Sequence, residues 1–148
     1  MTLKNALRVV RASALYDLIT AIGFLPFIAP SLLNALASLH HKLGLSGAAP
    51  DPTDVYVLMF ANLMGGLITV WALLRMFRPS LLMGAADTAG RALFTTGMAA
   101  AIANGASPLV WVMLVLEVIW GVVQGAAVLS AHLARRRSPG EDARHAHR

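Results

Sequence analysis

Residues 55–77 read VYVLMFANLMGGLITVWALLRMF, an apolar run in which the first charged residue is Arg75. At about 1.5 Å per helical residue, a run of this length crosses the ~30 Å hydrocarbon core of a bilayer. The whole chain has the same character, since 57% of its 148 residues are hydrophobic and only 13% are charged. Soluble domains carry about 25% charged residues. The chain therefore has too little polar surface for a water-soluble globule, and we predict a polytopic membrane protein.

Three further stretches are apolar and long enough to be spans, so the predicted fold is an all-α membrane protein with four transmembrane helices in a bundle. The expected spans are about 9–29, 55–77, 80–103 and 109–133. Together they form a transmembrane domain over residues 1–134, followed by a basic, disordered cytoplasmic tail over 135–148. Ala35-Leu36-Ala37 is similar to a signal-peptide cleavage site, but the preceding apolar run is long and contains Asp17. We expect the first helix to be retained.

Lysine and arginine residues are distributed unevenly between the two sides of this bundle. One side receives Lys4, Arg8, Arg11, Arg75, Arg78 and Arg135 to Arg137, and the other receives Lys42. Cytoplasmic flanks carry the excess of positive charge, so we expect a multi-pass protein of the cytoplasmic (inner) membrane with both termini in the cytoplasm. The loop over 31–54 is then outside. Its leucines recur at helical spacing, which predicts a short amphipathic helix, or an extension of the first helix bent at Pro26 and Pro30.

The two halves of the chain show a loose internal similarity. Residues 17–24 align with residues 87–94, and residues 62–66 align with residues 117–121. Each half would be a helical hairpin, and the two hairpins would be parallel repeats.

Each expected span carries polar or small residues at a spacing of three or four, which places them on one face of a helix. The four sets are Ser13, Asp17 and Thr20; Asn62, Gly66 and Thr69; Asp87, Arg91 and Thr95; Glu117, Gly121 and Gln124. Charge that faces lipid costs about 2.5–3.5 kcal/mol per residue at the helix centre, so these faces should meet inside the bundle. The predicted ligand or proton site consists of Asp17, Asn62, Asp87, Arg91, Glu117, Trp120 and Gln124.

The charges within the spans do not balance. Arg91 can pair with Asp87 at a spacing of four and with Glu117 across helices. Asp17 then has no cationic partner inside the spans. Because an isolated charge in a low dielectric is not sustained, either Asp17 is protonated or the site holds a cation or protonated amine. Alternatively, Arg91 receives an anionic headgroup, or the polar residues are only a structural network that fixes helix register.

Aromatic residues near the ends of the spans suggest how deep the helices lie. Tyr56, Trp71 and Trp111 are expected to be anchors at the two membrane interfaces. Trp120, three residues after Glu117, lies deeper and either packs in the bundle or stacks on a bound cation.

Three functions remain open from the sequence. The first is a transporter or carrier of a small or amphiphilic ligand, coupled to a proton on Asp17 or Glu117. The second is an intramembrane enzyme that performs isomerase-like acid–base chemistry on a lipid or isoprenoid substrate, with Asp17, Asp87 or Glu117 as the acid or base. The third is an accessory subunit of a larger membrane complex.

The composition narrows the expected cofactors and partners. The chain has no cysteine, which excludes disulfides, thiolate nucleophiles and iron–sulfur clusters. The pairs His40-His41 and His145/His147 each lack two further ligands for a metal ion. We expect no metal and no cofactor, and no nucleic-acid binding, because the basic residues are not interleaved with aromatic ones. The expected partners are membrane lipids, the small or amphiphilic ligand and further copies of the chain.

Overall fold

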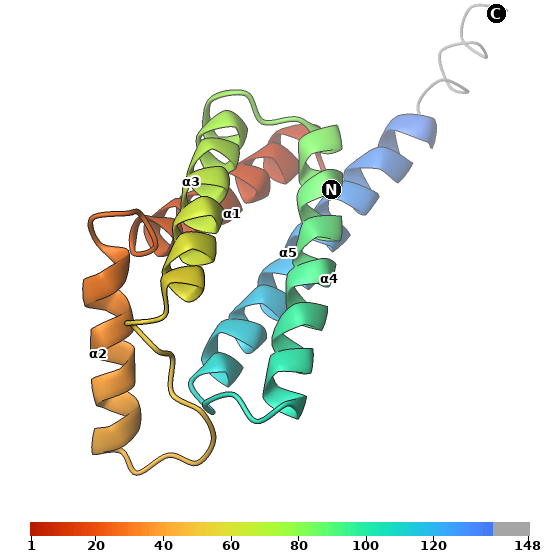
Figure 1. Ribbon diagram of the computed structural model, residues 1–148. Helices are drawn as coiled ribbons and strands as arrows, with labels where there is room; N and C mark the ends of the chain where they lie inside the picture. The colour runs from red at the N-terminus through yellow and green to blue at the C-terminus, as the bar shows by residue number, and fades with distance from the viewer. Residues whose placement is uncertain (138–148) are drawn as a thin grey trace, which may run out of the picture.

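The computed structural model describes residues 1–137, which form five helices and no strand (Figure 1). The helices are α1 (Leu3–Ile22), α2 (Ala29–Lys42), α3 (Val55–Phe77), α4 (Leu81–Ala103) and α5 (Val110–Arg137). The all-helical prediction is confirmed. Of the predicted tail over 135–148, residues 135–137 continue α5, and residues from 138 onward lie outside the described residues.

Short polar side chains set the starts of three helices. The hydroxyl of Thr2 accepts a hydrogen bond from the amide of Asn5, and the hydroxyl of Ser80 accepts one from the amide of Met83 at 3.1 Å. The carboxylate of Asp54 accepts two bonds at the start of α3. These side chains satisfy amides that have no partner within the helix.

The first helix ends at Ile22 and not at residue 29 as the span 9–29 predicted. Gly23 and Pro26 follow. Proline has no backbone N–H to donate, and its ring would clash with the preceding turn of a continuing helix. The chain turns and begins α2, which is the amphipathic helix predicted for the 31–54 loop. α2 buries Ala29, Leu33 and His40.

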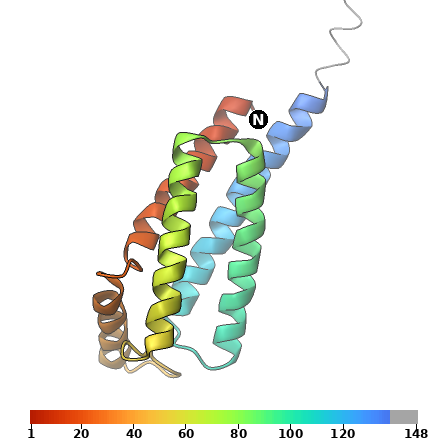
Figure 2. The same cartoon turned by 45° about the horizontal axis from the view of Figure 1, so that its top comes forward.

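The helices pack as two pairs, α1 with α3 and α4 with α5, and α1 also contacts α5 and, less extensively, α4. Figures 1 and 2 show both pairs side by side. These are the pairs that two helical hairpins require. We call the end of the bundle with the start of α1, the α3–α4 turn and the end of α5 the proximal end. The end with α2 and the α4–α5 loop is the distal end.

Burial is concentrated toward the proximal end. Ala6 of α1 packs against Ala127 and Ala131 near the end of α5, and Ala14 of α1 is also fully buried. Ala72 contributes from α3. Large apolar side chains are exposed toward both ends, such as Phe60 at the distal end and Phe77 and Leu82 at the proximal end. Small residues permit the close approach of helices, so the helices pack most closely near the proximal end, while apolar surface is exposed along the whole bundle.

Two helices, α3 and α5, are long and apolar enough to cross a membrane, where the sequence predicted four such spans. Only 11% of the apolar window in α3 and 17% of that in α5 is buried inside the protein. α1 is less apolar because it carries Lys4, Arg8, Arg11 and Asp17. α4 combines Asp87 and Arg91 with many glycine, alanine and threonine residues, which lower its hydropathy.

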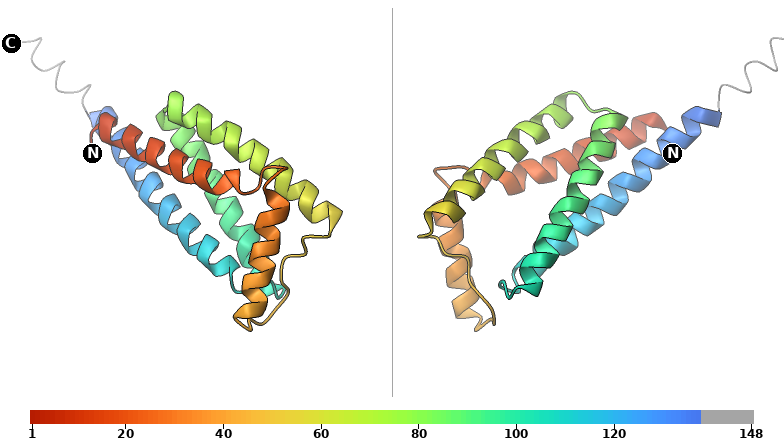
Figure 3. Two further views of the ribbon diagram at one scale, coloured as in Figure 1. Left: turned by 90° about the vertical axis from the view of Figure 1, so that its left-hand side faces the viewer. Right: turned by 45° about the vertical axis from the view of Figure 1, so that its right-hand side comes forward.

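The α2–α3 loop is joined to the α4–α5 loop at the distal end. The amide of Ala48 donates to the carbonyl of Gly105 at 2.7 Å, and the amide of Ser107 donates to the carbonyl of Ala48 at 2.9 Å. Next to this bridge, a side chain on Gly47 would lie 2.6 Å from the Gly105 carbonyl, and φ there is +85°. Glycine is therefore required at this position. Figure 3 shows α2 and the loop running toward the α4–α5 loop.

A buried histidine strengthens this distal connection. His40 is 4% exposed, and its Nδ1 lies 2.8 Å from the hydroxyl of Ser107. The same hydroxyl accepts a bond from the amide of Leu109 at 3.3 Å, as expected of a residue that caps α5. One serine therefore links α2 to the start of α5.

Candidate functional site: a buried charged cluster

Four helices bring five charged side chains together, and we call these five residues the charged cluster. They are Asp17 from α1, Arg75 from α3, Asp87 and Arg91 from α4, and Glu117 from α5. The two arginine side chains are 0% and 3% exposed. Buried charges are tolerated only when they are paired and hydrogen-bonded, so the contacts of each residue decide what the cluster can do.

Arg91 lies at the centre of the cluster. Its Nε is 3.2 Å from Asp87, and its Nη1 is 2.7 Å from Glu117. Its Nη2 is 2.5 Å from Asp17 and donates to the hydroxyl of Ser13 at 2.8 Å. The predicted pairing of Arg91 with Asp87 and Glu117 is confirmed.

Arg75 is the residue that the sequence analysis missed. It was expected to be a cytoplasmic flank of α3, but it is completely buried and binds both Asp17 and Asp87, the latter at 2.7 Å. The buried residues of α3 are Gly65, Ala72 and Arg75. Their spacing of seven and three places them on one helical face. This face of small residues was the available signal for the position of Arg75.

The expectation that Asp17 lacks a cationic partner is wrong. One carboxylate oxygen binds Arg91 and the other binds Arg75. Asp17 is therefore not an isolated charge that requires a proton or a bound cation. The reason is the rotation of α3, which directs Arg75 inward across α1.

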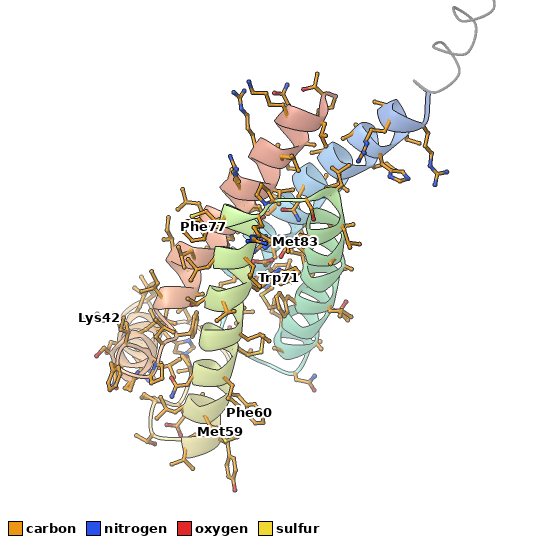
Figure 4. All side chains as sticks on the ribbon, turned by 90° about the horizontal axis from the view of Figure 1, so that it is seen from above. Lys42, Met59, Phe60, Trp71, Phe77 and Met83 are labelled. Atoms are coloured by element: carbon orange, nitrogen blue, oxygen red, sulfur yellow. The ribbon has the colours of Figure 1, made fainter. Side chains whose placement is uncertain are left out.

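Asp87 makes the most polar contacts of the three carboxylates. Besides the two arginines, it accepts bonds from the indole Nε1 of Trp71 at 2.8 Å and from the amide of Gln124 at 2.9 Å. Trp71 of α3 points toward α4 and donates its indole N–H to Asp87, and its expected role as an interface anchor stays a prediction (Figure 4). Its ring also lies 5.7 Å from the guanidinium carbon of Arg75. Asp87 and its neighbours thus join α3, α4 and α5.

Glu117 lies at the edge of the charged cluster. Its side chain is 14% exposed, the largest value among the three carboxylates. Within residues 1–137, only its Oε2 has a bonding partner, the guanidinium of Arg91. Tyr16 and Trp120 pack against each other nearby, with ring centroids 5.7 Å apart, and the Tyr16 ring lies 5.7 Å from the guanidinium carbon of Arg91. Glu117 is therefore the carboxylate best placed to meet a ligand.

Asn62 is not part of the charged cluster. It lines a separate shallow groove of about 490 Å³ beside Pro26 and the first turns of α3. Its Oδ1 is buried and has no hydrogen-bond partner among the described residues. The predicted site therefore divides into the cluster with Gln124 and Trp120 on one side, and Asn62 on the other.

The charge balance of the cluster determines its chemistry. Three carboxylates and two guanidiniums leave one negative charge in excess when all five groups are ionised. A proton or a bound cation at the edge would cancel that excess. Two surface grooves of the described residues, one between α4 and α5 and one beside Asn62, do not include any member of the cluster.

Comparison with known proteins does not connect this geometry to an established activity. No family model, no curated protein and no solved structure matches the chain.

Proposed function

We propose that the protein is a four-span carrier of the cytoplasmic (inner) membrane that binds a small cationic or amphiphilic ligand beside Glu117 and exchanges it for a proton. The single observation that supports this function best is the excess negative charge of the buried cluster, with Glu117 as its most exposed carboxylate.

The membrane placement follows from the distribution of polar side chains. The charges of α1 and α4 that make these helices less apolar lie partly in the cluster, where they are paired with α3 and α5. The remaining surface of all four helices carries many exposed apolar residues. Arg75 is left out of the charge count because it is buried in the cluster. The other basic residues that were counted toward the cytoplasmic side lie at the proximal end. Both termini are then cytoplasmic, and α2 lies outside.

The ligand class follows from the groups around Glu117. A carboxylate with one free oxygen attracts a cation, and the faces of aromatic rings do the same. Trp120 and Tyr16 provide such rings at the edge of the cluster. The flanking helices are apolar, so a cation with a hydrophobic body fits this position better than a hydrated inorganic ion.

We infer proton exchange because a proton and a cationic ligand compete for the same excess negative charge. A proton on Glu117 and a cation beside it each cancel the excess negative charge, so binding of one disfavours the other. Asp17 and Asp87 each contact both arginines. In this proposal those two carboxylates hold the arginines in place, and Glu117 exchanges the proton.

The test uses purified protein in vesicles with an acidic interior, potassium and valinomycin to clamp the membrane potential, and external tetraphenylphosphonium as the lipophilic cation. We expect the wild type to accumulate the probe faster than protein-free vesicles, with release of internal protons. Glu117→Gln retains the shape of the side chain and removes its charge, and it should abolish the difference. Asp51→Asn removes a carboxylate from the exposed α2–α3 loop and should not change uptake.

Tetraphenylborate is the matched control probe, because it has the same shape and the opposite charge, and it should not be accumulated. If folded Glu117→Gln takes up the cation like the wild type, Glu117 is not the site. If the folded wild type takes up no cation and Glu117→Gln only lowers stability, the cluster is a structural lock and the carrier proposal fails.

The orientation is tested separately, since the chain has no cysteine of its own. A single cysteine at Ser46 should react with an impermeant maleimide from outside intact cells. A cysteine at Lys4 should react only after the cells are opened. The opposite labelling pattern would show that the protein has the reverse orientation in the membrane.

A further inference from the structure

We infer that an anionic phospholipid binds along the groove between α4 and α5, with an acyl chain in the groove and its phosphate at the proximal end. This inference rests on the membrane placement in the proposed function, but it concerns a different site from Glu117.

The groove is long, apolar and formed by both helices of one pair. Its volume is about 530 Å³, within the ~300–1,000 Å³ range of small-ligand pockets. Its walls include Leu81, Ala85 and Thr88 from α4 and Gly125, Leu129 and His132 from α5. A Cβ atom on Gly125 would lie 3.1 Å from the methyl group of Thr88, so glycine allows the two helices to approach closely at this point of the groove. The groove runs along the helices, as an acyl chain in a bilayer does.

The one hydroxyl group in the groove wall, that of Thr88, already has partners. The hydroxyl of Thr88 donates to the carbonyl of Gly84 at 2.8 Å and lies 3.4 Å from the amide nitrogen of Gln124. The rest of the wall, apart from His132, is aliphatic. A polar occupant would lose its hydration without gaining hydrogen bonds, so the groove favours a hydrocarbon chain.

The proximal end of the groove is basic. His132 lines it, and Arg136 lies four residues further along α5, on the same helical face. Arg135 and Arg136 are exposed, and α5 extends past the start of α4 (Figure 1). Basic pockets between transmembrane helices on the cytoplasmic side bind the headgroups of anionic lipids. Charge complementarity therefore selects a lipid with a phosphate headgroup of net negative charge.

The experiment measures lipid binding to purified protein in neutral detergent by native mass spectrometry. The probes are dioleoyl phosphatidylglycerol and dioleoyl phosphatidylcholine, which share acyl chains and differ in headgroup charge. We expect the anionic lipid to bind at least fivefold more tightly. Arg136→Gln should weaken its binding by about fivefold, the effect of one basic side chain near the headgroups. Arg8→Gln, an exposed arginine of α1, is the matched control and should have no effect.

A second pair of variants tests the groove itself. Ala85→Phe fills the groove from α4 and should prevent binding of both lipids, whereas Ala86→Phe, at the exposed neighbouring position outside the groove, should not. Equal binding of the two lipids, or an Ala85→Phe variant that binds like the wild type, would overturn the inference. If free glycerol phosphate binds as tightly as the anionic lipid, the site binds an anion without an acyl chain, and the inference is also overturned. Glu117→Gln should bind the lipid like the wild type. Loss of cation transport in this variant and loss of lipid binding in Ala85→Phe are therefore separate results, and the two proposals can fail independently.

Discussion

Removal of Arg75 should destabilise the protein strongly, because two carboxylates depend on it. Arg75 is completely buried and contacts both Asp17 and Asp87. In Arg75→Met, Arg91 alone faces three carboxylates, so the cluster has two negative charges in excess. Breaking a buried ion pair by removing one partner costs about 3–5 kcal/mol. We expect a loss of this size in the free energy of unfolding, which is about a hundredfold or more in the equilibrium constant.

The assay is reversible unfolding in mixed micelles with increasing dodecyl sulfate, followed by circular dichroism. Arg78→Met removes an exposed arginine three residues away and should change stability by no more than about 0.5 kcal/mol. The double variant Arg75→Met with Asp17→Asn removes one charge of each sign and should recover part of the loss. If Arg75→Met is no worse than Arg78→Met, Arg75 is solvated and the cluster is assembled differently. If the double variant recovers nothing, packing and not charge explains the loss.

Three further changes test other parts of the structure with the same unfolding assay or with hydrogen exchange. Asp17→Asn should lose about 3 kcal/mol, because it removes a carboxylate that contacts both buried guanidiniums, even though the cluster then has no net charge. A variant as stable as the wild type would mean that these two ion pairs do not hold the cluster together. His40→Phe should speed exchange of the distal backbone amides that join the two loops, whereas the exposed His41→Phe should not; equal rates would rule out the histidine connection. Gly65→Ala should cost about 1–3 kcal/mol, because its new methyl group would lie 2.6 Å from the backbone carbonyl of Phe24. Gly66→Ala meets nothing within 4 Å and should be neutral or slightly stabilising. Equal effects would contradict the packing of α3 on the α1–α2 turn.

Local signals in the sequence determined the helices and one ion pair. The bounds of α3 were predicted to the residue, because Asp54 caps its start and Arg78-Pro79 ends its apolar run. Asp87 and Arg91 are four residues apart on one helix, so helical geometry alone brings them together. The outer amphipathic helix was likewise visible in the leucine spacing. The end of α1 was misplaced, since hydrophobicity continues through Gly23 and Pro26 although the helix does not.

Only the tertiary structure decided which residues complete the cluster. Arg75 and Asp17 are 58 positions apart, and no local pattern relates them. Their contact depends on the rotation of α3 about its axis, which is set by the close packing of Gly65 against the backbone of Phe24. A hydropathy pattern shows that α3 is apolar on every side, so it contains little information about that rotation. Composition and periodicity thus determined which segments are helical, and the packing of small residues determined which charges meet.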